Sequence, residues 1–62
     1  MADVRNDIVN EIRRIEGEIG EQKILIKRNV GKRLVIETAE TEMKALHTRL
    51  STLEANLAKL QG

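Results

Sequence analysis

The stretch KILIKRNVGKRLVI, residues 23–36, decides the fold of this chain. Its two apolar triplets lie symmetrically about Val30, and Gly31 follows directly. Basic residues in a last helical turn, with a glycine just after it, are typical of the C-terminal end of a helix. We therefore expect the chain to fold back at residues 30–32, with the triplets contributing to the core at that end.

The segment before this stretch carries a heptad pattern. Isoleucines and Gln22 recur at spacings of 4, 3, 4, 3 and 4 residues, which is the seam of a coiled coil. Asp3 is the expected N-cap, and Asp7 adds a negative charge in the next turn, where the helix dipole favours it. The pattern predicts a helix over residues 3–29. Its seam residues are Ile8, Ile12, Ile15, Ile19 and Ile26.

The segment after the stretch carries a second heptad pattern, with spacings of 3 and 4 residues from Ile36 onward. It predicts a helix over residues 33–61. Ile26 and Ile36 are ten residues apart, so one continuous helix would have to absorb a break in heptad phase at a glycine, and a turn is the simpler explanation. The seam residues here are Ile36, Ala39, Met43, Leu46, Leu50, Leu53, Leu57 and Leu60.

Two arms of nearly equal length predict an all-α fold, an antiparallel, coiled-coil-like helical hairpin forming a single domain over residues 1–62. Facing residues would have numbers that sum to about 61, which brings Glu11 near Arg49 and Lys23 near Glu40. Both pairs are attractive. One pair of glutamates also falls opposite each other, so the charges support this register without establishing it.

A competing fold joins two helices by a short β-hairpin at residues 24–36, because both apolar triplets favour strands and flank a candidate turn. Thr38 would then cap the second helix. We favour the all-helical hairpin because the heptad pattern continues up to Ile26 in the first arm and begins again at Ile36 in the second. Gln22 is the only polar residue at a seam position.

Gly17 and Gly20 lie within the first predicted helix, where each is less favourable than alanine. Three interpretations are open. The glycines are tolerated on an exposed face, they make a flat face that another helix approaches closely, or one of them ends the helix as a C-cap.

Self-association is expected because a chain of 62 residues has a small core and no cysteine to cross-link it. Isoleucine at both seam positions disfavours dimeric parallel coiled coils and points to a bundle. The simplest assembly is a homodimer that forms a four-helix bundle. The predicted oligomer core comprises Ile8, Ile12, Ile15, Ile19, Ile26, Ile36, Met43, Leu46, Leu50, Leu53, Leu57 and Leu60.

Catalytic, cofactor and metal signatures are absent from the sequence, and we expect neither enzymatic activity nor a cofactor. His47 is the only histidine, and the chain holds no cysteine. Gly31-Lys32 lacks the remaining residues of a phosphate-binding loop.

Charge is distributed unevenly: residues 23–36 hold five of the eleven basic residues and none of the ten acidic ones. A hairpin would gather these cations at one end, where they could contact phosphates or an acidic protein surface. The absence of aromatic residues weakens the case for single-stranded nucleic acid. The candidate anion- or partner-binding residues are Lys23, Lys27, Arg28, Lys32 and Arg33.

These features predict a small oligomeric protein that acts by protein–protein interaction, in a structural, adaptor or inhibitor role. The alternative is a binder of nucleic acid or a phosphorylated small molecule through the basic end. No apolar run is long enough to span a bilayer, so we expect a soluble, cytoplasmic protein without a membrane partner.

Overall fold

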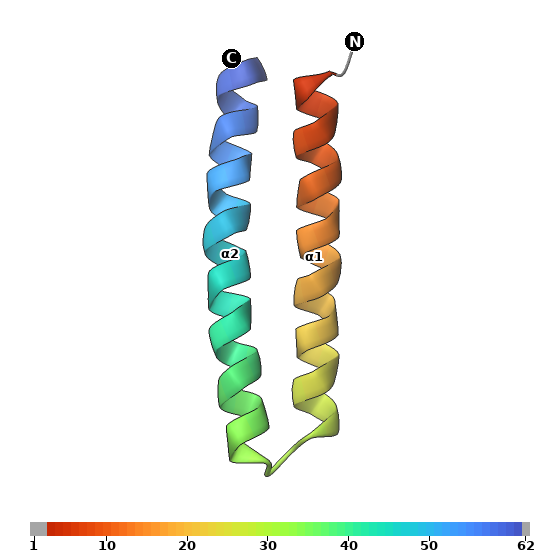
Figure 1. Ribbon diagram of the computed structural model, residues 1–62, viewed down its shortest axis with the longest axis vertical. Coiled ribbons are helices and arrows are strands. Elements are labelled where there is room, and N and C mark those ends of the chain that lie inside the picture. The colour runs from red at the N-terminus through yellow and green to blue at the C-terminus, as the bar shows by residue number, and fades with distance from the viewer. Residues whose placement is uncertain (1–2, 62) are drawn as a thin grey trace.

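The computed structural model describes residues 3–61 as two antiparallel helices, α1 (Val4–Arg28) and α2 (Arg33–Gln61), which lie side by side (Figure 1). The predicted all-α hairpin is confirmed. The turn between the helices lies at what we call the closed end, and α1 begins where α2 ends, at the open end. The Cα atoms span 47 × 17 × 13 Å, so the molecule is a rod.

Helix α1 begins where the sequence indicates, because Asp3 caps it. The Asp3 backbone is extended, and its Oδ1 accepts a hydrogen bond of 3.0 Å from the Arg5 N–H. This bond satisfies one of the N–H groups that a helix leaves without partners in its first turn. Asp7 lies in the first turn and Lys27 and Arg28 in the last, as the helix dipole favours.

The turn at the closed end depends on Asn29 and Gly31. The Asn29 N–H donates to the Ile26 carbonyl at 3.2 Å, and the Asn29 Nδ2 donates to the Leu25 carbonyl at 2.7 Å. Gly31 has a φ of 86°, in the left-handed region that glycine enters without steric cost. The Lys32 N–H then donates to the Asn29 carbonyl at 2.9 Å, which closes the reversal.

The β-hairpin alternative is wrong, because the part of the chain that the structure describes contains no strand. Both apolar triplets lie in helices. Thr38 does not cap α2; its hydroxyl donates to the Leu34 carbonyl at 2.8 Å from within the helix. The heptad seam outweighs local strand preference here, because helical geometry keeps Ile26 and Ile36 at the contact between the two helices.

The core lies in the middle of the rod. Only four side chains among residues 3–61 are buried, and Ile15 is the most enclosed, at 0% exposure. Ile19 and Leu46 join Ile15 in one cluster, against which Met43, Leu50 and Leu53 pack. Ala39, at 1% exposure, is the fourth buried residue. A single chain therefore encloses a short core and covers the rest of its seam only in part.

Candidate interaction surfaces

The predicted oligomer-core residues lie along the contact between α1 and α2. Eleven of the twelve are buried or half-buried in the single hairpin; the exception is Leu60, which is 49% exposed near the end of α2. Gln22, the polar residue of the seam, is half-buried as well. One chain thus uses these side chains to join its own two helices, and their part in an oligomer remains a prediction.

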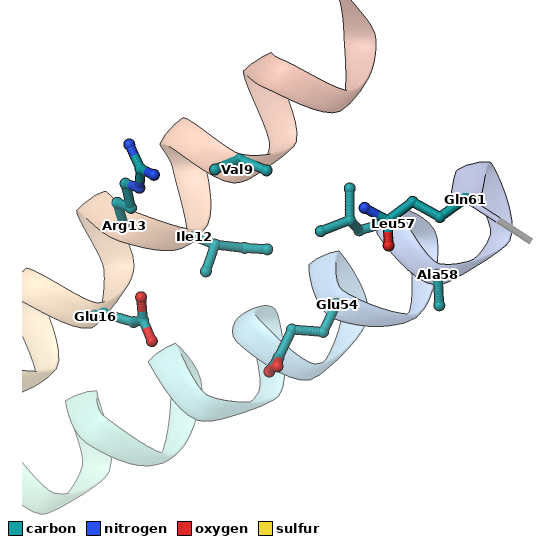
Figure 2. A pocket seen from close by; sticks show the side chains of 8 residues that line it. All are labelled: Val9, Ile12, Arg13, Glu16, Glu54, Leu57, Ala58 and Gln61. Atoms are coloured by element: carbon teal, nitrogen blue, oxygen red, sulfur yellow. The ribbon is translucent and has the colours of Figure 1, made fainter.

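A groove runs between the helices near the open end, with a volume of about 380 Å³. Figure 2 shows Ile12 of α1 and Leu57 of α2 directed toward the space between the helices. Sequence reasoning missed this groove, because a seam identifies the side of each helix that faces its partner but not how completely the two sides close. The groove is lined by Val9, Ile12, Arg13, Glu16, Glu54, Leu57, Ala58 and Gln61.

Charged side chains gather around Glu11, on the opposite side of the seam from Glu16. The guanidinium of Arg14 donates to both carboxylate oxygens of Glu11, through Nε and Nη2, and its Nη1 donates to Glu18 at 2.7 Å. The Nε of Arg49 on α2 lies 3.6 Å from Oε1 of Glu11. This last contact confirms one of the two attractive pairs expected across the hairpin.

The carboxyl group of Glu11 has a pKa below its ordinary value of 4.5. The main cause of the lowered pKa is the hydrogen bond from Arg14. Desolvation is the next largest effect and raises the pKa, and the positive charges of Arg14 and Arg49 lower it further. The second expected pair, Lys23 with Glu40, does not form an ion pair within residues 3–61.

The closed end exposes three side chains of the apolar triplets, which we expected in the core. Leu34 in the first turn of α2 is 79% exposed, and Ile24 and Leu25 are 51% and 41% exposed; Val30 on the turn is 82% exposed as well. The expectation was wrong for these three triplet residues, for a geometric reason. Three consecutive residues span about 200° of a helix, so only part of each triplet can face the other helix. Ile26 is the member of the first triplet that does so, and it is half-buried.

The five predicted cations lie in the same stretch of the chain, residues 23–36, as these apolar side chains, and all five are exposed. Arg33 pairs with Glu37, with 2.9 Å between Nε and Oε1, and both side chains are largely in solvent. Within residues 3–61, the other four form no ion pair. The first turn of α2 contains no acidic residue, so Lys32 and Arg33 lie at a helix N-terminus where the dipole disfavours cations.

Gly17 and Gly20 face open space, because a Cβ added at either would meet nothing within 4 Å. Helix α1 continues through both to Arg28, so the C-cap interpretation is wrong. Helix α2 does not approach them closely either. What remains is tolerance on an exposed face, or a contact with another chain.

Neither a metal cluster nor a membrane span is found in the described part of the chain: no three His, Asp or Glu side chains of residues 3–61 are placed to hold an ion, and no helix there is long and apolar enough to cross a bilayer. His47 lies exposed on α2. No protein-family model matches the sequence, and neither a curated protein nor a solved structure shows significant similarity to it. The class that the fold defines is a two-helix hairpin with a groove at one end and an apolar, basic surface at the other.

Proposed function

We propose that this chain is a self-associating interaction module, in which two hairpins pair through the groove at the open end to form a four-helix bundle. The observation that carries the proposal is the incomplete closure of the seam. Four buried side chains within residues 3–61 are few for a stable fold, while Val9, Ile12 and Leu57 line an open groove. A second hairpin supplies the apolar surface that the first one lacks.

The rim of the groove suits pairing between identical chains. It carries Arg13 and Glu16 on α1 and Glu54 on α2, so charges of both signs border the apolar floor. In a two-fold symmetric dimer, each surface meets a copy of itself in reverse orientation. Arg13 of each chain can then approach an acidic rim residue of its partner, and such rim charges select the arrangement more than they strengthen it.

In this proposal the bundle serves as a structural element, an adaptor or an inhibitor, and it acts by binding another protein. The assembled core gives rigidity to a short chain, and the surface left outside the dimer remains free for that partner. Neither a cofactor nor a catalytic step is part of the proposed function.

Sedimentation equilibrium over a range of concentrations tests the self-association. We expect a mass near twice the 7.0 kDa of one chain at micromolar concentration. Ala58→Glu places a charged side chain in the groove and should shift the equilibrium toward monomer. Ala55→Glu is the matched control, because Ala55 is an exposed alanine of the same helix that does not line the groove.

Circular dichroism of the same samples shows whether each variant keeps its helices. A fully helical monomer of the unaltered chain at micromolar concentration would overturn the proposal. So would an Ala58→Glu variant that assembles as tightly as the unaltered chain.

A second candidate function is binding of an anionic ligand through the cations of the closed end. It is favoured by one observation: four of those five cations are exposed without an ion pair within residues 3–61. The test is a titration with nucleic acid or a phosphorylated small molecule at several salt concentrations, in which affinity falls as salt rises. A variant with glutamine at Lys27, Arg28, Lys32 and Arg33 should lose both the binding and its salt dependence.

A further inference from the structure

We propose that the closed end docks on the surface of an anionic lipid membrane, where Val30 and Leu34 enter the boundary between headgroups and acyl chains and the surrounding cations contact lipid phosphates. The inference deepens the second candidate function by assigning its ligand class, and it does not depend on self-association. Such a contact is peripheral, so it needs no apolar run long enough to span the bilayer.

The closed end combines exposed apolar and basic side chains at one end of the rod. Among residues 3–61, the two most exposed large apolar residues are Val30, at 82%, and Leu34, at 79%; Lys32 and Arg33 lie between them in the sequence. Lys27 and Arg28 occupy the last turn of α1 at the same end. A membrane surface satisfies both kinds of side chain, because aliphatic groups enter the acyl boundary while lysine and arginine stay at the phosphates.

The rest of the chain carries the opposite charge. Outside residues 23–36 there are six basic and ten acidic residues, so the arms carry a net charge of −4 while the closed end carries +5. An anionic surface attracts the closed end and repels the arms. The two helices lie antiparallel with the turn at one extremity (Figure 1), so this polarity holds the rod end-on, with the open end away from the membrane.

The closed end is narrow, because the rod measures 17 × 13 Å across its Cα atoms. A stable protein–protein interface buries roughly 800 Å² on each partner, and one centred on this end would extend onto the acidic arms. Insertion of a few side chains into a lipid surface has no such requirement, and its strength grows with each apolar group and each cation.

Other occupants fit less well. A second closed end would bring two +5 surfaces together, and they would repel each other. Nucleic acid would neutralise the cations but leave Val30 and Leu34 in water, and the chain has no aromatic residue on which a base could stack.

Vesicle flotation tests the apolar part of the proposal. The full chain should bind vesicles of phosphatidylcholine mixed with phosphatidylserine, and bind pure phosphatidylcholine vesicles weakly. Replacing both Val30→Ser and Leu34→Ser keeps every charge and should lower the partition coefficient roughly ten-fold or more. The control is Val4→Ser, which removes an exposed apolar side chain at the open end and should leave partitioning unchanged.

A second set of variants tests the cations. Each basic residue at an anionic surface contributes roughly five-fold to the partition coefficient. Replacing Lys27, Arg28 and Lys32 by glutamine should therefore lower it roughly 100-fold. The control variant has the same net charge and carries glutamine at three exposed cations that lie outside both the closed end and the groove, Arg5, Lys44 and Lys59. Its partition coefficient should change several-fold at most.

A fluorescent reporter tests insertion directly. The chain has no cysteine, so Val30→Cys provides a single site for an environment-sensitive dye. Its emission should shift to the blue when phosphatidylserine vesicles are added. The same dye on Val4→Cys, at the open end, should not shift.

The proposal is overturned if the chain fails to bind phosphatidylserine vesicles, if the serine pair at Val30 and Leu34 binds as well as the unaltered chain, or if the controls lose as much affinity as the tested variants. Binding to nucleic acid but not to vesicles would keep the closed end as an anion site and exclude the membrane. Sedimentation of the closed-end variants separates this question from self-association, because their oligomeric mass should stay that of the unaltered chain.

Discussion

Glu11 and Arg49 connect the two helices across the hairpin, with 3.6 Å between Oε1 of Glu11 and Nε of Arg49. Arg14 holds the same carboxylate from within α1. The contact fixes which residue of α2 lies opposite which residue of α1. Because the Arg49 side chain is 62% exposed and solvent screens the charges, the pair favours this register of the hairpin and adds little to its stability.

Acidification should weaken the folded state through Glu11. Its pKa is lowered in the fold, so its stabilising contribution is present above the ordinary value of 4.5 and is lost as pH falls through the lower, folded pKa. Thermal melts below pH 4.5 should therefore depend less on pH in Glu11→Gln than in the unaltered chain. Glu40→Gln, which removes an exposed carboxylate without an ion pair in residues 3–61, is the control. Equal pH dependence in the unaltered chain and in Glu11→Gln would contradict the assignment.

Ile15→Ala should cost about 2–5 kcal/mol of unfolding free energy, because Ile15 is fully enclosed and its truncation leaves a cavity. For a chain of this size, that loss approaches complete unfolding. Ile24→Ala is the same substitution in the same helix at a residue that is 51% exposed, and it should cost less than about 1 kcal/mol. Urea titrations followed by circular dichroism at one fixed concentration measure both. Similar losses would show that Ile15 is not the centre of the core.

Gly17→Ala and Gly20→Ala should each stabilise the fold by about 1 kcal/mol, because the added methyl group meets open space and alanine favours the helix. Gly31→Ala should have the opposite effect, since its φ of 86° costs an L-residue about 1 kcal/mol or more. Thermal denaturation gives the sign of each change. If the first two variants lose oligomeric mass instead, the glycine face is where a second chain approaches, as one interpretation of the sequence holds.

Asp3→Ala should cost about 1 kcal/mol, because the Arg5 N–H loses the carboxylate that accepts its hydrogen bond. Asp3→Asn keeps an acceptor oxygen at the same place, and its loss should be smaller. Amide hydrogen exchange in the first turn of α1 locates the effect. Exchange that is equally fast in both variants would show that the capping bond does not hold this end.

Much of the fold could be predicted from local spacing. The heptads gave the two helices, the ten residues between Ile26 and Ile36 required a turn, and Asp3 and Gly31 marked where α1 begins and where the chain reverses. The register followed from arm length and was correct at Glu11 and Arg49. Each of these features follows from the local sequence or from the number of residues between two positions. They could therefore be predicted without knowing how far apart the two helices lie.

The candidate surfaces were predicted less well. The cations of the closed end could be identified because charged residues are visible in the sequence. The exposure of Val30, Leu34 and Ile24 was not predicted, and neither was the groove beside Ile12 and Leu57. An apolar residue in a seam or triplet can be covered, half-covered or bare, and the difference depends on how closely the second helix lies against it.

The sequence by itself determined that this chain is two heptad helices folded back near Gly31, because the period of apolar side chains and the backbone freedom of glycine are properties of the chain. Only the tertiary structure decided that Ile15, Ile19, Ala39 and Leu46 are enclosed, while Val30 and Leu34 at the closed end stay in water. A side chain is buried only where another surface packs against it. In a two-helix hairpin each helix has one neighbour, so only the side that faces this neighbour can be covered.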